Sequence, residues 1–113
     1  QSGSGITERT RIMVRRRVAI GKDFLCAWGV YITDCDWHVV DGRPFQQDVV
    51  IGDRVWVAPE SSILKGARIG ADCIVAAHSL VHKAEIPDHS LVAGNPARAV
   101  GQVGRWSRDL PAS

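Results

Sequence analysis

Aliphatic residues return at every sixth position through most of this 113-residue chain. From residue 51 onward the hexads begin with an aliphatic residue in one shared phase: Ile51, Val57, Ile63, Ile69, Val75 and Val81. A period of six fits neither an amphipathic helix, which needs about 3.6 residues, nor an alternating strand. It predicts a parallel β-helix in which each hexad forms one short face of a triangular coil, with successive coils about 4.8 Å apart.

The same phase extends backwards from the middle of the chain, where the leading residues are Val14, Ile20, Cys26 and Ile32. The fifth place of each hexad is predicted to fill a corner of the coil. It is small or apolar in most hexads, whereas Asp36 and Glu85 are exceptions. After Ile86 the period is expected to end.

The period is interrupted between Trp37 and Ile51, where the residues are mainly polar and turn-forming. We expect residues 38–50 to leave the coil as a loop. Insertions in solenoids often build the binding surface, so this loop is the first place to look for chemistry.

Length and composition favour one globular domain, since 45% of the residues are hydrophobic. Residues 6–100 are expected to form the β-helix, 101–113 an irregular or short helical tail, and 1–5 a flexible linker or cloning remnant. A formal charge of +2 is too small to indicate a nucleic-acid binder. With no apolar run near the roughly 20 residues of a membrane span and no signal-peptide pattern, a cytoplasmic location is expected.

Arg15, Arg16 and Arg17 form the most basic run of the chain. They are expected to point outward from the first coil, between inward Val14 and Val18. A charged face there discourages edge-to-edge association at the open end of the solenoid. We favour this reading over a nucleic-acid patch, because no aromatic ladder accompanies the arginines.

These hexads resemble the hexapeptide-repeat acyltransferases. The resemblance runs from about Val14 to Val100, and IGDRVWV, ILKGARIG, SLVHK and AGNPARAV are similar, in content and order, to segments of the sugar O-acetyltransferase branch. It implies an all-β, left-handed parallel β-helix and a homotrimer with active sites between subunits. It also implies direct transfer of an acetyl group from acetyl-CoA to a hydroxyl of a sugar or polysaccharide precursor.

His38 is the candidate catalytic residue. A lone histidine in a loop is usually only solvated, although its pKa range suits proton transfer near neutral pH. In the resembled family a histidine in this loop is the general base that deprotonates the acceptor hydroxyl, and the segment DCDWH looks like that motif. The resemblance therefore assigns the base role to His38.

Four residues are candidates for binding the acceptor: Asp34, Asp36, Trp37 and Trp56. The aspartates could orient the imidazole or bind hydroxyls, or they could serve as turn formers where the chain leaves the coil. Asp36 is the better candidate, because a carboxylate in a corner place needs a partner. The tryptophans offer flat faces for a sugar ring or a pantetheine arm, unless they are structural.

Cys35, next to this group, is not expected to be a nucleophile, because neighbours on an extended chain point to opposite sides. The three cysteines are odd in number and lack metal-type spacing, so reduced thiols are expected.

In the resembled family acyl-CoA lies in a groove between two subunits along the C-terminal coils. The resemblance places the donor against Ala58, Ala76 and Ala77, with Lys83 and Arg98 suited to its phosphates. Without the surrounding motif the two basic residues would be ordinary solvated charges. The family's glycines are replaced here by Ala58, Ala76 and His78.

Two rival functions use the same fold. A gamma-class carbonic anhydrase needs a histidine where this chain has Lys65, and His78 and His82 are not spaced as a metal pair on a solenoid, so no metal is expected. A noncatalytic trimeric scaffold or ligand-binding module is the alternative to an enzyme. The residues alone do not identify the acceptor.

Overall fold

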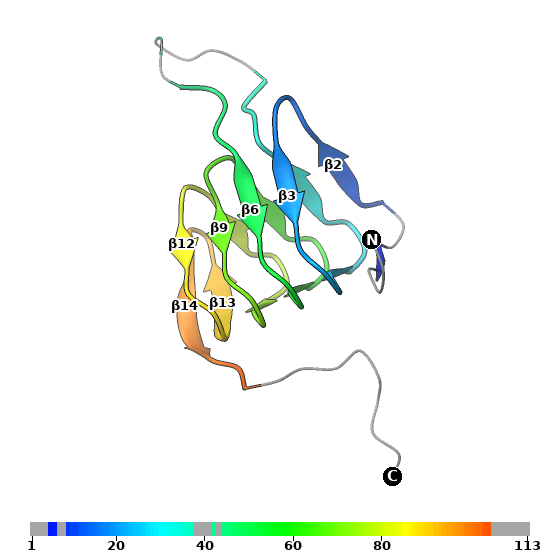
Figure 1. Ribbon diagram of the computed structural model, residues 1–113, viewed down its shortest axis with the longest axis vertical. Helices are drawn as coiled ribbons and strands as arrows, with labels where there is room; N and C mark the ends of the chain where they lie inside the picture. The colour runs from blue at the N-terminus through cyan, green and yellow to red at the C-terminus, as the bar shows by residue number, and fades with distance from the viewer. Residues whose placement is uncertain (1–4, 7–8, 38–41, 43, 105–113) are drawn as a thin grey trace.

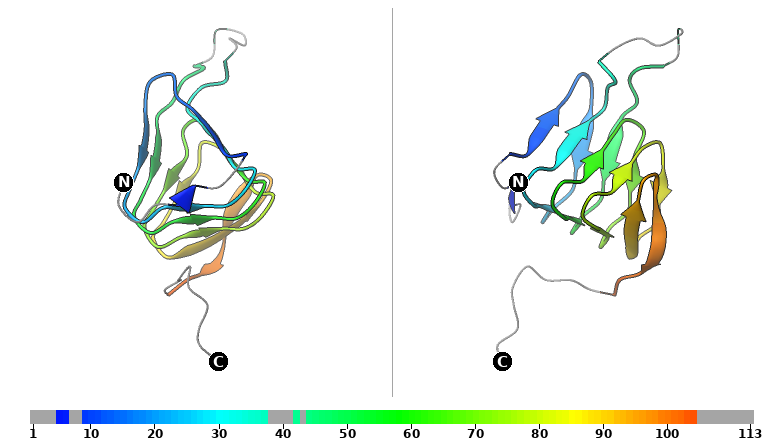
Figure 2. Two further views of the ribbon diagram at one scale, coloured as in Figure 1. Left: turned by 90° about the vertical axis from the view of Figure 1, so that its right-hand side faces the viewer. Right: turned by 180° about the vertical axis from the view of Figure 1, so that it is seen from behind.

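The computed structural model describes residues 5–6, 9–37, 42 and 44–104. These residues form a three-sided parallel β-helix without helices, seen from the side in Figure 1 and turned by 90° in the left panel of Figure 2. The described part of the chain therefore holds no helix that could cross a membrane.

Each side of the coil is one sheet, and the chain visits the three sheets in turn. Face A contains β1 (Gly5–Ile6), β4 (Leu25–Cys26), β7 (Trp56–Val57), β10 (Ile74–Val75), β13 (Ser90–Gly94) and β14 (Ala97–Gln102). Face B contains β2 (Arg11–Met13), β5 (Tyr31–Thr33), β8 (Ser62–Ile63) and β11 (Leu80–Val81). Face C contains β3 (Val18–Ile20), β6 (Val49–Ile51), β9 (Arg68–Ile69) and β12 (Glu85–Ile86).

The leading aliphatic residues stack along the inside of each face, as the period predicts. The strand registers align Cys26, Val57, Val75 and Val92 on face A, Ile32, Ile63 and Val81 on face B, and Ile51, Ile69 and Ile86 on face C. All of these residues are buried. Burying one large aliphatic side chain is worth about 1.5–3 kcal/mol, so the repeated stacks contribute strongly to the stability of the coil.

The expected phase is wrong at the start of the chain. Ile12 pairs with Ile32 and packs against the core, whereas Val14 is 49% exposed. From Ile12 to Ile20, which pairs with Ile51, the chain advances eight positions instead of six. The two additional residues widen the corner that contains Arg15–Arg17.

The period also continues further than expected. Ile86 pairs with Ile69, so the corner before it is one residue short, and Glu85 points outward while Ala84 packs against the core. One more regular hexad then leads from Ile86 to buried Val92.

All of these irregularities fall at the corner between faces B and C, here called the B–C corner. The eight-position advance, the loop after β5 and the short turn before β12 occur there. The corners from A to B and from C to A keep the hexad spacing, as between Cys26 and Ile32 or Ile51 and Val57.

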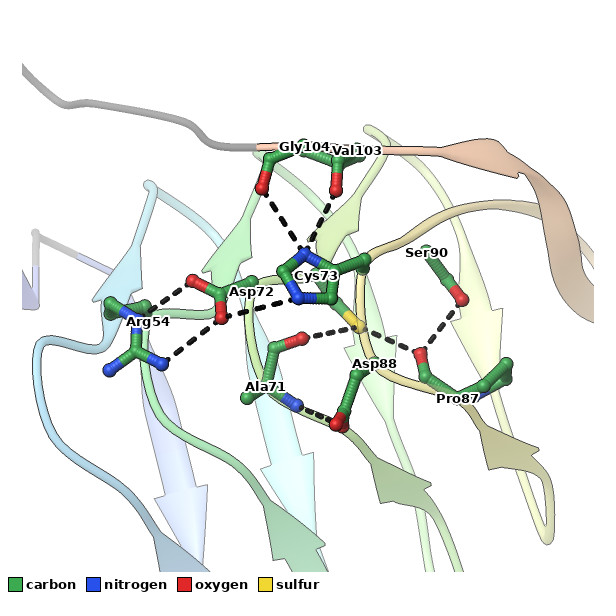
Figure 3. Close-up of polar contacts among 10 residues, drawn as sticks. Arg54, Ala71, Asp72, Cys73, Pro87, Asp88, Ser90, Val103 and Gly104 are labelled. Carbon is green, nitrogen blue, oxygen red and sulfur yellow. Dashed lines mark hydrogen bonds and ion pairs between the residues drawn. The ribbon is translucent and has the colours of Figure 1, made fainter.

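An antiparallel hairpin of β13 and β14 closes face A at its C-terminal end. β14 runs to Gln102, across the expected start of the tail at residue 101, and residues 105–113 lie outside the described residues. His89 holds the segment after β14: its Nδ1 lies 3.1 Å from the carbonyl oxygens of both Val103 and Gly104 (Figure 3).

Gly52 provides a test of the coil spacing. A Cβ at residue 52 would lie 2.8 Å from backbone atoms of Gly70 and Ala71 in the next coil. We expect Gly52→Ala to lower the free energy of unfolding by about 1–3 kcal/mol, because the backbones must separate to admit the methyl group.

Urea denaturation monitored by circular dichroism measures this effect. Gly104→Ala is the matched control, because nothing lies within 4 Å of an added Cβ there. Equal stability of the two variants would contradict the close packing of the coils.

Candidate functional site

The neck of the loop is a short antiparallel segment that rises from the B–C corner at the top of Figure 1. Asp36 N–H donates to the Phe45 carbonyl at 2.8 Å, Gln47 N–H donates to the Asp34 carbonyl at 3.0 Å, and Cys35 forms a bridge with Gln46. His38 lies outside the described residues, so its role as a base stays a prediction.

Asp34 is fully buried beneath the neck. Its carboxylate accepts hydrogen bonds from the backbone N–H groups of Arg15, Arg16 and Arg17 at 2.7–2.8 Å and from the Gln46 amide at 3.1 Å. These contacts favour the turn-forming alternative, because the carboxylate is occupied in joining the widened corner of the first coil to the neck. Burial by itself raises the pKa of Asp34, but the four hydrogen bonds outweigh it and the net shift is downward.

Asp36 is paired with Lys65, but it lies in the exposed loop neck rather than in a buried corner of the coil, so burial of the carboxylate is not what requires the partner. The Nζ atom of Lys65 lies 2.6 Å from Asp36 Oδ2 and donates to the Pro44 carbonyl at 2.8 Å. The Lys65 side chain is only 6% exposed, while that of Asp36 is 39% exposed. Lys65 therefore holds both strands of the neck from the adjacent coil. The residue pattern alone assigns Lys65 no such role and uses it only against a carbonic anhydrase.

Trp37 is anchored by its polar edge and leaves much of its surface open. Its Nε1 donates to Thr33 Oγ1 at 3.0 Å and its backbone N–H to Cys35 Sγ at 3.2 Å. The residue is 41% exposed and has a positive φ of 65°. Cys35 is buried, and its sulfur accepts the hydrogen bond from Trp37. Cys26 and Cys73 are also buried and hydrogen-bonded, and none of the three forms a disulfide.

A second histidine, His82, follows β11 at the same corner. Burial lowers the pKa of its imidazole, and the positive charges of Lys83 and Lys65 lower it further against the opposing effect of Asp36. The neutral form therefore dominates at neutral pH. His78 lies at a different corner, after β10, so the two histidines are not a metal pair.

The donor candidates Ala58, Ala76 and Arg98 come together on face A. The register of β4, β7, β10 and β13 aligns Ala27, Ala58, Ala76 and Ala93 in a row, and Ala93 pairs with Arg98 of β14. This alanine row lies beside a row of larger outward residues that includes Trp56: Leu25, Trp56, Ile74 and Leu91. Small side chains therefore form one continuous row on this face, beside the row of larger ones.

The remaining donor candidates lie elsewhere. Ala77 is exposed at the turn that follows the alanine row, and Lys83 is at the B–C corner, near the loop. In a three-sided coil the B–C corner is opposite face A. The structure therefore separates the candidates into two groups on opposite sides of the coil. One group is Asp34, Asp36, Trp37 and Lys83, and the other is Trp56, Ala58, Ala76 and Arg98.

The Asp36–Lys65 pair is asymmetric, and this predicts unequal effects of removing its members. Asp36→Ala leaves a buried ammonium with one carbonyl partner, and we expect it to lower the free energy of unfolding by about 3–5 kcal/mol. Lys65→Met leaves a carboxylate that water can reach, so a smaller loss of about 1–2 kcal/mol is expected. Chemical denaturation measures the free energy of unfolding of both variants. An equal or larger loss for Lys65→Met would contradict the prediction.

Asp34 predicts a pH-dependent contribution to stability. Its folded-state pKa is lowered, so the stabilisation is complete above the unfolded value of about 3.9 and is lost as the pH falls through the folded value. Asp34→Asn should cost at least about 2 kcal/mol at pH 7. The difference from the unsubstituted protein should shrink in denaturation experiments at pH 3 and below. A difference that stays constant or grows in acid would disprove this role.

Comparisons with known proteins agree with the fold. Residues 48–83 match the family described as bacterial transferase hexapeptide (six repeats). The putative acetyltransferase YvoF of Bacillus subtilis (strain 168) is 32% identical over 89 residues, which cover 79% of this chain and 50% of YvoF. The putative lipopolysaccharide biosynthesis O-acetyl transferase WbbJ of Escherichia coli (strain K12) is 34% identical over 97 residues, covering 74% of this chain and 49% of WbbJ.

Among solved structures, the polysialic acid O-acetyltransferase OatWY superposes with a TM-score of 0.79 at 28% identity, covering 92% of this chain and 53% of OatWY. The chain thus spans about half the length of these relatives. The expected all-β, left-handed parallel β-helix is confirmed. On its repeats, its fold and these similarities, the chain belongs to the hexapeptide-repeat transferases.

Proposed function

We propose that this protein is an O-acetyltransferase that moves an acetyl group from acetyl-CoA to a hydroxyl of a sugar or polysaccharide precursor. The observation that carries the proposal is the pairing of two features on one solenoid. A rigidly anchored loop neck rises from the B–C corner, and a row of small side chains ending at a basic residue crosses face A. The loop neck suits an acceptor, and the row of small side chains suits an extended thioester.

The opposite positions of these features support a homotrimer. Asp36 and Ala58 lie on opposite sides of the coil, so one chain does not bring its own loop to its own alanine row. A second subunit that presents its face A to the loop of the first would complete the site. Each interface of a closed ring of three would then hold one such site.

The donor side fits the chemistry of coenzyme A. The pantetheine arm is long, thin and mostly apolar, which suits a row of alanines beside partly buried Trp56. Arg98, at the end of that row, offers a guanidinium fork to phosphate. Ala77 lies at the turn that follows the row. Lys83, on the loop side of the neighbouring subunit, would supply a second positive charge.

The reaction needs a base and no covalent enzyme intermediate. The acceptor hydroxyl gives its proton to His38 as its oxygen attacks the thioester carbonyl, and the C–S bond breaks to release coenzyme A. The proton then passes from His38 to the thiolate. Trp37, held by Thr33 at the start of the loop, offers a flat surface for the sugar ring.

The named relatives support a saccharide acceptor. WbbJ is named for lipopolysaccharide biosynthesis and OatWY for polysialic acid.

A cytoplasmic location also remains a prediction.

Substitution of His38 tests the proposal. Removal of a positioned general base costs about 10² to 10⁴ in rate, so His38→Ala should reduce the release of CoA thiol from acetyl-CoA by that factor. The assay detects free thiol while a panel of sugars is supplied as acceptors. The reaction product is identified by mass spectrometry as an added acetyl group.

His89→Asn is the matched control, because His89 lies at the corner between faces C and A, away from the loop, and asparagine tolerates its positive φ of 59°. Unchanged thiol release by His38→Ala would remove His38 from the mechanism. Failure to bind acetyl-CoA at millimolar concentration would favour the noncatalytic scaffold.

A further inference from the structure

The widened corner of the first coil, next to the loop neck, carries three consecutive exposed arginines. The backbone N–H groups of Arg15, Arg16 and Arg17 all point to the Asp34 carboxylate, at 2.8, 2.8 and 2.7 Å. This arrangement fixes the backbone at the corner, and all three residues are exposed.

The charges of these arginines are not neutralised by ion pairs among the described residues. The salt bridges found there join other basic groups to carboxylates: Arg9 to Glu60, Arg54 to Asp72, Lys65 to Asp36 and His89 to Asp72. The Asp34 carboxylate binds the backbone N–H groups of the three arginines rather than their guanidinium groups, and its single negative charge offsets only one of the three positive charges. A local positive potential therefore remains at this corner, although the net charge of the chain is only +2.

Two of the arginines line a depression that the loop neck completes. Arg15, Arg16, Phe45 and Gln46 surround an open volume of about 470 Å³. The Arg15 guanidinium carbon lies 5.1 Å from the centre of the Phe45 ring, which limits the positions of this side chain. Phe45 in turn is tied to Asp36 through its carbonyl at 2.8 Å, so the depression shares a wall with the start of the candidate acceptor loop.

We infer that this depression is an acceptor subsite that binds an anionic group, a carboxylate or a phosphate, carried by the saccharide. Guanidinium forks pair with such groups through two parallel hydrogen bonds, and an aromatic ring packs against the apolar face of a sugar. That the anionic group belongs to the acceptor rests on the proposed function. Binding of the anion itself does not depend on catalysis.

A second depression that arginines line does not share this property. It is bordered by Arg9, Arg11, Gly29 and Glu60, and Glu60 pairs with Arg9 at 3.2 Å. In that depression the Glu60 carboxylate of the protein itself already pairs with an arginine. If Arg15–Arg17 only prevented the association of solenoid ends, their substitution would leave the affinity for anions unchanged. A binding measurement therefore distinguishes the two roles.

The experiment measures binding by titration calorimetry with three probes: an oligomer of hexuronic acid, its carboxyl-reduced neutral counterpart, and a nucleotide diphosphate sugar. The variants are Arg15→Gln, Arg16→Gln and the double substitution. Each keeps the backbone N–H that Asp34 needs, so the fold should be retained. Arg68→Gln is the matched control, since Arg68 is an exposed arginine on face C.

We expect at least one anionic probe to bind, and to lose about tenfold in affinity for each arginine removed, with the loss reduced at high salt. The neutral probe and Arg68→Gln should show no such loss. Loss confined to the acid oligomer identifies a carboxylate, and loss confined to the nucleotide sugar identifies a phosphate. Equal effects of Arg15→Gln, Arg16→Gln and Arg68→Gln would overturn the inference, as would failure of both anionic probes to bind.

Thiol release separates this inference from the proposed function. Arginine-dependent binding without release of CoA from acetyl-CoA would reject the acetyltransferase and keep the anion site. Release that is equally fast with acidic and neutral acceptors, and insensitive to Arg15→Gln and Arg16→Gln, would keep the enzyme and reject the anion site.

Discussion

The structure depends on the stacking of one aliphatic side chain per face on its counterpart in the next coil. This contact is repeated on three faces and buries the residues that hold the coils together, such as Val57 on Val75 and Ile63 on Val81. Because the register between coils is parallel and direct, every additional or missing residue has to be absorbed at a corner. In this chain the B–C corner absorbs them, while the other two corners keep the regular spacing.

Concentrating the irregularities at one corner creates a place for buried charge. Asp34 and Lys65 are both nearly inaccessible, and each is satisfied by hydrogen bonds that tie the loop neck to a neighbouring coil. Buried charges contribute little net stability compared with apolar packing, but they require one geometry. The two residues thus give the neck a defined orientation that stacked aliphatic residues do not impose on a segment outside the coil.

A triangular solenoid also separates functions by side. Outward residues of face A form continuous rows because each coil repeats the one before it. The opposite corner instead carries the loop neck, which occurs in one coil. A long, thin donor suits the repeated surface, and a specific acceptor suits the unique one. Assembly of several copies is the simplest way for such a fold to bring the two surfaces together, which connects the proposed trimer to the geometry of a single chain.

The six-residue period by itself determined the class of fold, the inward residues from Ile20 to Val81 and the position of the loop, because a solenoid repeats local contacts that are written in the spacing. It misplaced Val14 and missed Val92, because counting does not reveal how many residues a corner holds. The sequence also indicated that Asp36 needs a partner. Only the tertiary structure identified Lys65, 29 positions away, and separated the candidate residues onto two sides, because both depend on which residues the coiling brings together.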